Sequence, residues 1–208
     1  MTTVFPPPVA SPTRLLAFAT LAALALAGCA TPAIVVGGGA TAGVAIAQER
    51  SVGDAIDDTT IAVTVDKLWY EHDWKLFANV AQEVHEGRVL ITGTVKDPQD
   101  RLDAVRLAWR AQGVREVINE IQVTDKGGVV NYARDSWITT QLWTKLTFDE
   151  TVRAINYSVE TVNGTVYLMG IAQDKDELDR VTEYARNIRY VHSVVSHVWL
   201  KTDPRRYS

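Results

Sequence analysis

The chain has 208 residues and a formal net charge of -4, with 47% hydrophobic and 22% charged residues. This composition is ordinary for a globular protein, and the length suits one domain or two small ones. The slight excess of acidic residues argues against a nucleic-acid partner, which selects a clustered basic surface. Because Cys29 is the single cysteine, no disulfide can form within the chain.

The N-terminal residues predict a lipoprotein signal peptide over 1–28. An apolar run from Leu15 to Ala27 follows one basic residue, Arg14. The run has the length of a signal-peptide core and is too short to cross a bilayer as a helix. It ends in Leu-Ala-Gly-Cys29, which resembles the bacterial lipobox, whose cysteine is acylated and becomes the first mature residue. The alternative is an ordinary signal peptide with a chance cysteine.

Cys29 is therefore the predicted lipidation site, and several acyl chains give a stable membrane anchor. The next residues are Ala30 and Thr31 rather than aspartate. By resemblance to enterobacterial sorting rules, this favours the outer membrane, with the chain facing the periplasm of a Gram-negative bacterium.

Residues 29–56 are expected to form a lipidated tether rich in small residues. The stretch 37–43 is glycine-rich. A phosphate-binding loop requires a lysine and a hydroxyl residue after its glycines, and no lysine follows here. The sequence therefore favours a tether over a phosphate site.

An internal repeat organises the remaining chain. A shift of 77 positions places Asp58 on Asp135 and continues without a gap through both copies. It predicts two modules, 57–125 and 134–202, with a linker over 126–133 and a tail over 203–208. The same shift aligns Ile61 with Ile138, Asn79 with Asn156, Glu83 with Glu160, Gly87 with Gly164, Gly93 with Gly170 and Asp97 with Asp174.

Each copy is predicted to run helix, strand, strand, helix, strand. The first helices are expected to begin near Asp58 and Asp135, which are favourable N-cap residues. Their apolar positions recur every four residues and so lie on one helical face. These positions are Ile61, Val65 and Trp69 in the first copy, and Ile138, Leu142 and Leu146 in the second.

A β-hairpin follows each first helix. Its turn is Glu86-Gly87 in the first copy and Asn163-Gly164 in the second, and Asn-Gly is a strong hairpin signal. Gly93 and Gly170 interrupt the strand after the turn, which predicts a bulge or a close approach of another backbone.

The second helices are predicted to begin after the N-caps Asp97 and Asp174. A short sheet with two helices on one face makes an α+β module. The fold class is therefore two tandem αββαβ modules, each with a three-stranded mixed sheet packed against two helices. The expected apolar contacts of the second helices are Leu102, Val105 and Trp109, then Leu178, Val181 and Ile188. The closing strands are expected to contain Val117, Ile121 and Val123, then Val194, Val198 and Leu200.

This element order, with its hairpin and strand glycines, resembles the BON domain. The segments 50–53, 57–58, 135–140 and 166–170 carry the resemblance. Two copies behind a lipobox look like the dual-BON outer-membrane lipoproteins of Gram-negative bacteria. The resemblance implies anionic phospholipid binding by the first helix of the second domain, including Trp137, and a role in envelope integrity. It implies no enzymatic activity.

The two copies differ where binding is expected. Trp137 and Trp143 replace Thr60 and Asp66 of the first copy; Trp137 is expected to face away from the core and Trp143 to lie on its flank. Tryptophan favours the membrane interface, and basic residues attract anionic headgroups. The predicted lipid-binding residues are Trp137, Trp143, Arg134 and Lys145, with Arg153 soon after; residues 131–208 as a whole carry ten basic and ten acidic residues.

Other chemistry finds less support in the sequence. His192 and His197 are expected to point to opposite faces of the closing strand, so no metal or other cofactor is predicted. His197 shares a strand face with Trp199, opposite Val198, and that face is expected to be exposed or to contact a partner. The alternative function is a periplasmic adaptor or chaperone-like protein without direct lipid binding. Trp137 and Trp199 are then contacts to another protein. A further alternative is that Trp137 and Trp143 pack against the other module or the linker.

Overall fold

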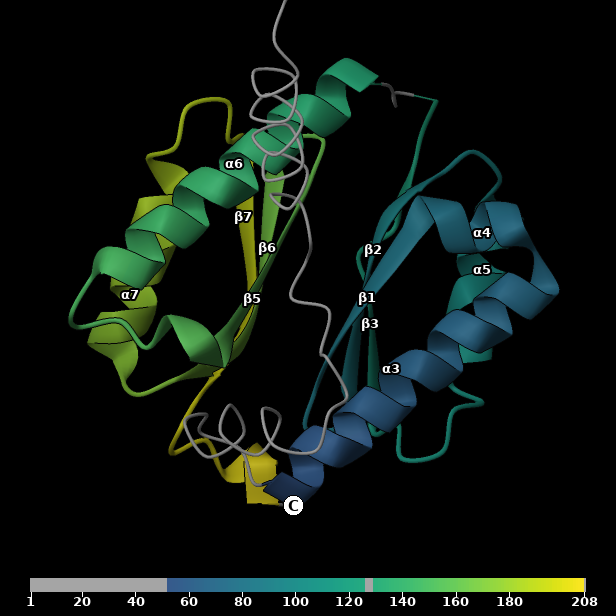
Figure 1. Ribbon diagram of the computed structural model, residues 1–208, viewed down its shortest axis with the longest axis horizontal. Coiled ribbons are helices and arrows are strands. Elements are labelled where there is room, and N and C mark those ends of the chain that lie inside the picture. The colour runs from purple at the N-terminus through teal and green to yellow at the C-terminus, as the bar shows by residue number, and fades with distance from the viewer. Residues whose placement is uncertain (1–51, 126–128, 208) are drawn as a thin grey trace, which may run out of the picture. The chain divides into compact units, whose positions relative to one another are not determined.

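The computed structural model describes residues 52–125 and 129–207, and it contains two α+β modules. In each module a mixed sheet is covered on one face by helices, as Figure 1 shows. This confirms the predicted fold class. The predicted signal peptide, Cys29 and the glycine-rich stretch 37–43 lie outside the described residues.

The first module places β2 at the centre of its sheet, antiparallel to β1 and parallel to β3 and β4. The closing strand is thus divided in two, and an additional short helix, α4, precedes the hairpin. The elements are α3 (Val52–His72), α4 (Trp74–Asn79), β1 (Val80–His85), β2 (Arg88–Val95), α5 (Pro98–Ala108), β3 (Glu116–Asn119) and β4 (Gln122–Val123).

The second module repeats this topology with an undivided closing strand, in the order β5-β6-β7. Its first helix begins within the segment that was expected to be a linker. The elements are α6 (Val129–Phe148), the 3-10 helix η1 (Ala154–Asn156), β5 (Tyr157–Val162), β6 (Thr165–Ala172), α7 (Lys175–Arg186) and β7 (Ser193–Leu200), followed by the 3-10 helix η2 (Pro204–Tyr207).

The two cores differ in the size of the side chains at equivalent positions. In the first module Trp69 is fully buried, and its indole nitrogen donates to the Ala104 carbonyl over 3.0 Å. The second module has Leu146 and Val181 at these positions, both fully buried. Because the Trp69 ring fills the space beneath α5, that helix meets the ring at a small residue, Ala104. The prediction that Leu102 and Trp109 pack into this core was wrong, since both are more than half exposed.

Asp58 and Asp135 are not N-caps, contrary to the sequence prediction, because α3 and α6 begin several residues earlier. Each carboxylate instead accepts two backbone hydrogen bonds from the hairpin turn of its own module. Asp135 accepts from the amides of Asn163 and Gly164 over 2.7 and 2.8 Å, and Asp58 accepts equivalently from Glu86 and Gly87. The buried aspartate therefore joins the first helix to the hairpin.

The strand glycines allow close backbone contact, as predicted. A Cβ atom on Gly170 would lie 2.0 Å from the Asn156 carbonyl oxygen, and one on Gly93 would lie 2.3 Å from that of Asn79. Both predicted hairpin turns have positive φ at their two central residues, which is the geometry of a type I′ turn.

The two modules contact each other through the sheet faces that carry no helix. Leu90 of β2 packs with Tyr167 and Met169 of β6 in a small apolar cluster. Arg88 stacks on the Trp199 ring, with its guanidinium carbon 3.7 Å from the ring centroid. His197 is 2.9 Å from a Glu120 carboxylate oxygen. The face of β7 with His197 and Trp199, expected to be exposed or to meet a partner, is thus occupied by the first module.

Polar contacts surround this apolar cluster. Arg206 of η2 forms a buried ion pair with Glu86, at 2.6 Å. Every buried apolar side chain of the described residues lies between Ile61 and Val198. The unit Ala42–Ser208 therefore contains both cores, and we expect it to fold without the preceding residues.

Candidate functional site

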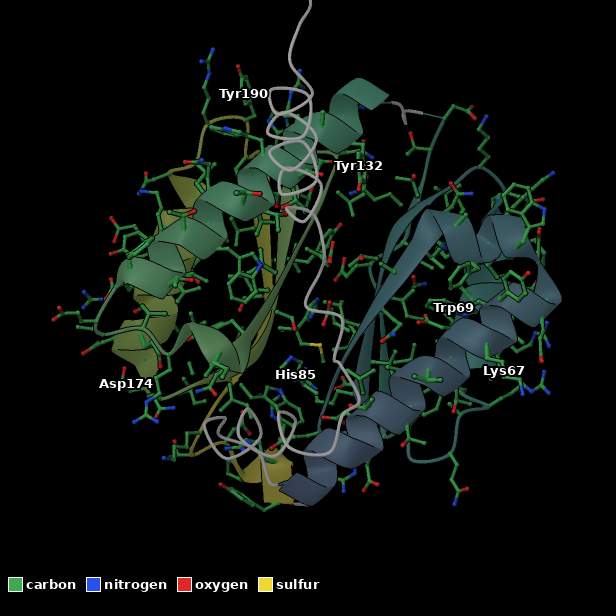
Figure 2. The ribbon with its side chains drawn as sticks, viewed as in Figure 1. Lys67, Trp69, His85, Tyr132, Asp174 and Tyr190 are labelled. Atoms are coloured by element: carbon green, nitrogen blue, oxygen red, sulfur yellow. The ribbon has the colours of Figure 1, made fainter. Side chains whose placement is uncertain are left out.

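An exposed aromatic pair lies on the second module. Trp137 of α6 is 42% exposed and Tyr190, in the loop between α7 and β7, is 40% exposed. Their rings meet edge to face, with centroids 6.1 Å apart and an interplanar angle of 70°. Figure 2 shows Tyr190 beside the N-terminal half of α6. Two segments far apart in the sequence thus build one aromatic surface.

Tyr190 adopts a backbone conformation that is unfavourable for a tyrosine. Its φ angle is +72°, and the equivalent residue of the first module is Gly113, with φ of +94°. Glycine enters this left-handed region without steric cost, whereas a bulky residue there is strained. Such strain is concentrated at functional sites, where a side chain is held in place at the expense of stability.

Two arginines surround the Tyr190 ring. The guanidinium carbon of Arg134 lies 5.0 Å from its centroid and that of Arg189 lies 4.6 Å away, both within cation–π distance. Among the described residues, neither arginine forms an ion pair with a carboxylate. Their charges are therefore available to an anion outside the protein. We call Trp137, Tyr190, Arg134 and Arg189 the aromatic–basic cluster.

The other two predicted lipid-binding residues lie elsewhere on α6. Trp143 is half-buried and packs against the core of the second module. Lys145 lies two turns beyond Trp137, with its ammonium 5.5 Å from the centroid of Tyr184. The Tyr184 hydroxyl donates to Asp149, and hydrogen bonds from Thr151 and Tyr184 lower the pKa of that carboxyl to about 2. Lys145 therefore contacts the Tyr184 ring, apart from the aromatic–basic cluster.

Tyr190 and Arg189 were missed at the sequence level. The segment 186–193 contains two arginines and a histidine and no acidic residue, although the second module as a whole is balanced in charge. Its counterpart in the first copy, 109–116, contains Gly113 where this segment has Tyr190. This difference between the loops of the two copies distinguishes the segment in the sequence.

The cluster combines the two features that favour an anionic membrane surface. Aromatic side chains partition to the boundary between acyl chains and headgroups, and each nearby arginine contributes about 1 kcal/mol of attraction to anionic lipid. None of the helices described in the structure is long and apolar enough to span a bilayer. The geometry suits attachment to a membrane surface.

Comparison with known proteins places the repeat in a named family. The model of the BON domain matches residues 57–125 and 134–201. An uncharacterised protein of Anaplasma centrale, encoded in the gshII 5′ region, is 41% identical over 70% of this chain and 96% of its own length. The outer membrane lipoprotein DolP of Haemophilus influenzae is 36% identical over 77% of this chain and 82% of its own. The osmotically-inducible protein Y of Escherichia coli is 29% identical over 70% and 73%.

Proposed function

Because the chain belongs to the BON-domain family and carries two copies of the domain, we propose that it is an outer-membrane lipoprotein whose second module binds anionic phospholipid. Cys29 carries the covalent lipid anchor and the modules face the periplasm. The name of the relative from Haemophilus influenzae supports the location. The role is binding in support of envelope integrity, not catalysis.

The aromatic–basic cluster is the observation that carries this proposal. Trp137 and Tyr190 are large, exposed and in mutual contact, while the arginines beside them have no carboxylate partner among the described residues. Neither arrangement contributes to packing in a protein core. A membrane interface accommodates both, because the rings enter the acyl boundary and the guanidinium groups meet phosphates.

Liposome flotation of the fragment 42–208 tests the proposal. We expect wild-type protein to float with vesicles of 30% phosphatidylglycerol in phosphatidylcholine and not with pure phosphatidylcholine. Trp137→Ala removes an interfacial ring and should weaken this binding about tenfold or more, because a buried tryptophan contributes over 2 kcal/mol.

Trp109→Ala is the matched control, since Trp109 is 51% exposed on the first module and outside the cluster. It should bind vesicles as the wild type does. If folded wild-type protein fails to float with either vesicle, or if both tryptophan variants lose binding equally, lipid recognition by the second module is wrong.

A second candidate is the adaptor function, and the first module provides an observation in its favour. Tyr70 and Phe77 meet edge to face with centroids 5.8 Å apart, and Trp74 between them in sequence is 62% exposed. The equivalent residues of the second copy are Thr147, Thr151 and Ala154. Exposed aromatic residues of this kind are enriched at protein interfaces. Site-specific cross-linking at Trp74 in intact cells tests the adaptor function. A defined adduct with an envelope protein supports it, and the absence of any such adduct excludes it.

A further inference from the structure

A polar hollow of about 440 Å³ lies next to the aromatic–basic cluster. Arg134 belongs to both, because it stacks on Tyr190 and also lines the hollow. The first module contributes the end of β4, and the second contributes the start of α6, the hairpin turn and the residue preceding β7. The lining residues with a part in the argument are Gln122, Val123, Asn131, Arg134, Asn163 and His192.

The amide side chains of the hollow are fixed by one another. Asn163 donates through Nδ2 to Gln122 Oε1 over 2.9 Å, and Asn131 donates to Asn163 Oδ1 over 3.4 Å. Gln122 donates in turn to the Tyr167 hydroxyl over 3.2 Å. This network holds the polar wall in one arrangement, so a ligand meets a preorganised surface rather than ordering it at an entropic cost.

The charge of the hollow suits an anion. Asp135 also lines it, but both oxygens of its carboxylate accept backbone hydrogen bonds from the hairpin turn. Arg134 and His192 also line the hollow, and both side chains carry N–H donors. His192 also lines a second hollow of about 330 Å³, together with Arg186. Arg134 and His192 thus line the first hollow, and His192 and Arg186 line the second.

From this placement we infer that the hollow binds the phosphate ester of a single anionic phospholipid headgroup, with Arg134 and His192 as its donors. The inference rests on the proposed function and makes it more specific. The aromatic pair enters the membrane, while the adjacent hollow receives one headgroup projecting from its surface. Because Gln122 and Val123 belong to the first module, headgroup recognition requires both modules.

The test fills the hollow without substituting any residue of the aromatic–basic cluster. Val123→Phe in the fragment 42–208 adds a ring to the lining from the first module, where Val123 is 37% exposed. Val63→Phe makes the same change at a 64% exposed position on α3 and is the matched control. His192→Ala removes one donor. Flotation uses vesicles of 30% phosphatidylglycerol, and NMR titration uses glycerol 3-phosphate and inorganic phosphate as soluble probes.

We expect Val123→Phe and His192→Ala each to weaken vesicle binding about tenfold, the effect of losing a charge-assisted hydrogen bond, while Val63→Phe binds normally. Glycerol 3-phosphate should shift the amide resonances of Asn131, Asn163 and His192 in the wild type and not in Val123→Phe. This second measurement is independent of vesicle binding, and thermal melting establishes that each variant is folded.

Other outcomes overturn the inference in distinguishable ways. If Val123→Phe binds vesicles like the wild type and no probe shifts the hollow, binding depends on the cluster alone and only the headgroup site is wrong. If the soluble probes bind in the hollow but the wild type does not bind vesicles, the ligand is a free phosphate ester. Both the lipid headgroup and the proposed lipid-binding function are then wrong. If nothing binds, both are wrong.

Discussion

At position 190 a tyrosine occupies a backbone conformation for which the other module uses glycine. The left-handed conformation costs an L-residue about 1–2 kcal/mol, and only glycine avoids this cost. The Tyr190 ring contacts Trp137, Arg134 and Arg189, so all members of the cluster depend on it. Folding alone gives no reason for this residue, whereas ligand binding does.

Tyr190→Gly separates these two contributions. We expect a melting temperature equal to or above that of the wild type, because relief of the strain offsets the lost contacts of a partly exposed ring. Vesicle binding should fall at least as far as in Trp137→Ala. Calorimetry and flotation on the same preparation measure both. A variant that is destabilised but still binds vesicles would show that Tyr190 serves the fold.

The module depends on the contact between its first helix and its hairpin. Asp135 in α6 and Asp58 in α3 each hold two turn amides, and both carboxylates are buried. Charge-assisted hydrogen bonds of this kind are stronger than neutral ones, and losing them leaves buried amides without partners. The same turn carries Asn163 and Gly164 into the wall of the hollow, so this contact also positions the proposed headgroup site.

Asp135→Ala should therefore lower the free energy of unfolding by about 2–4 kcal/mol, as two buried amide donors lose their acceptor. Asp176→Ala removes an exposed carboxylate from the first turn of α7 and should cost less than about 1 kcal/mol, the scale of a helix-dipole interaction. Urea unfolding followed by circular dichroism compares them. Equal losses would mean that the turn contact contributes little.

The contact between the modules contains a carboxyl group, that of Glu160, whose ionised form is disfavoured in the folded protein. Burial and the nearby Glu83 carboxylate raise the pKa of Glu160 from 4.5 to about 7. Glu83 itself accepts a hydrogen bond from Ser158, which also meets His85 of the first module at 2.9 Å. A raised folded-state pKa means that the folded protein binds the extra proton more tightly than the unfolded chain.

The stability contributed by protonated Glu160 is therefore complete below about pH 4.5 and is lost as the pH rises through about 7. Glu160→Gln keeps the neutral shape and should raise the melting temperature at pH 8 while leaving it unchanged at pH 4. Glu150→Gln, at an exposed position, is the control and should change neither. If the melting temperature of Glu160→Gln depends on pH as that of the wild type does, the ionised form of Glu160 is not disfavoured by burial.

Local sequence patterns predicted most of the elements of each module, but not the differences in side-chain size between the two cores. The repeat, the hairpin turns, the strand glycines and the caps Asp97 and Asp174 depend on neighbouring residues, and the structure contains all of them. Leu102 and Trp109 were wrongly assigned to the core. Helical periodicity identifies the apolar face of a helix, but not how much space the core leaves for side chains on that face. That space is set by Trp69, which is remote in sequence.

The sequence by itself determined the family, the two-module organisation and the element order, since these follow from short-range periodicity and a constant 77-residue shift. It also predicted Trp137 as a binding residue from its difference between the two copies, and Arg134 from its place on the same helix. Only the tertiary structure decided that Trp199 lies against Arg88, that Trp143 is half-buried and that Tyr190 and Arg189 join the cluster. These are contacts between segments far apart in the chain, and only packing brings them together.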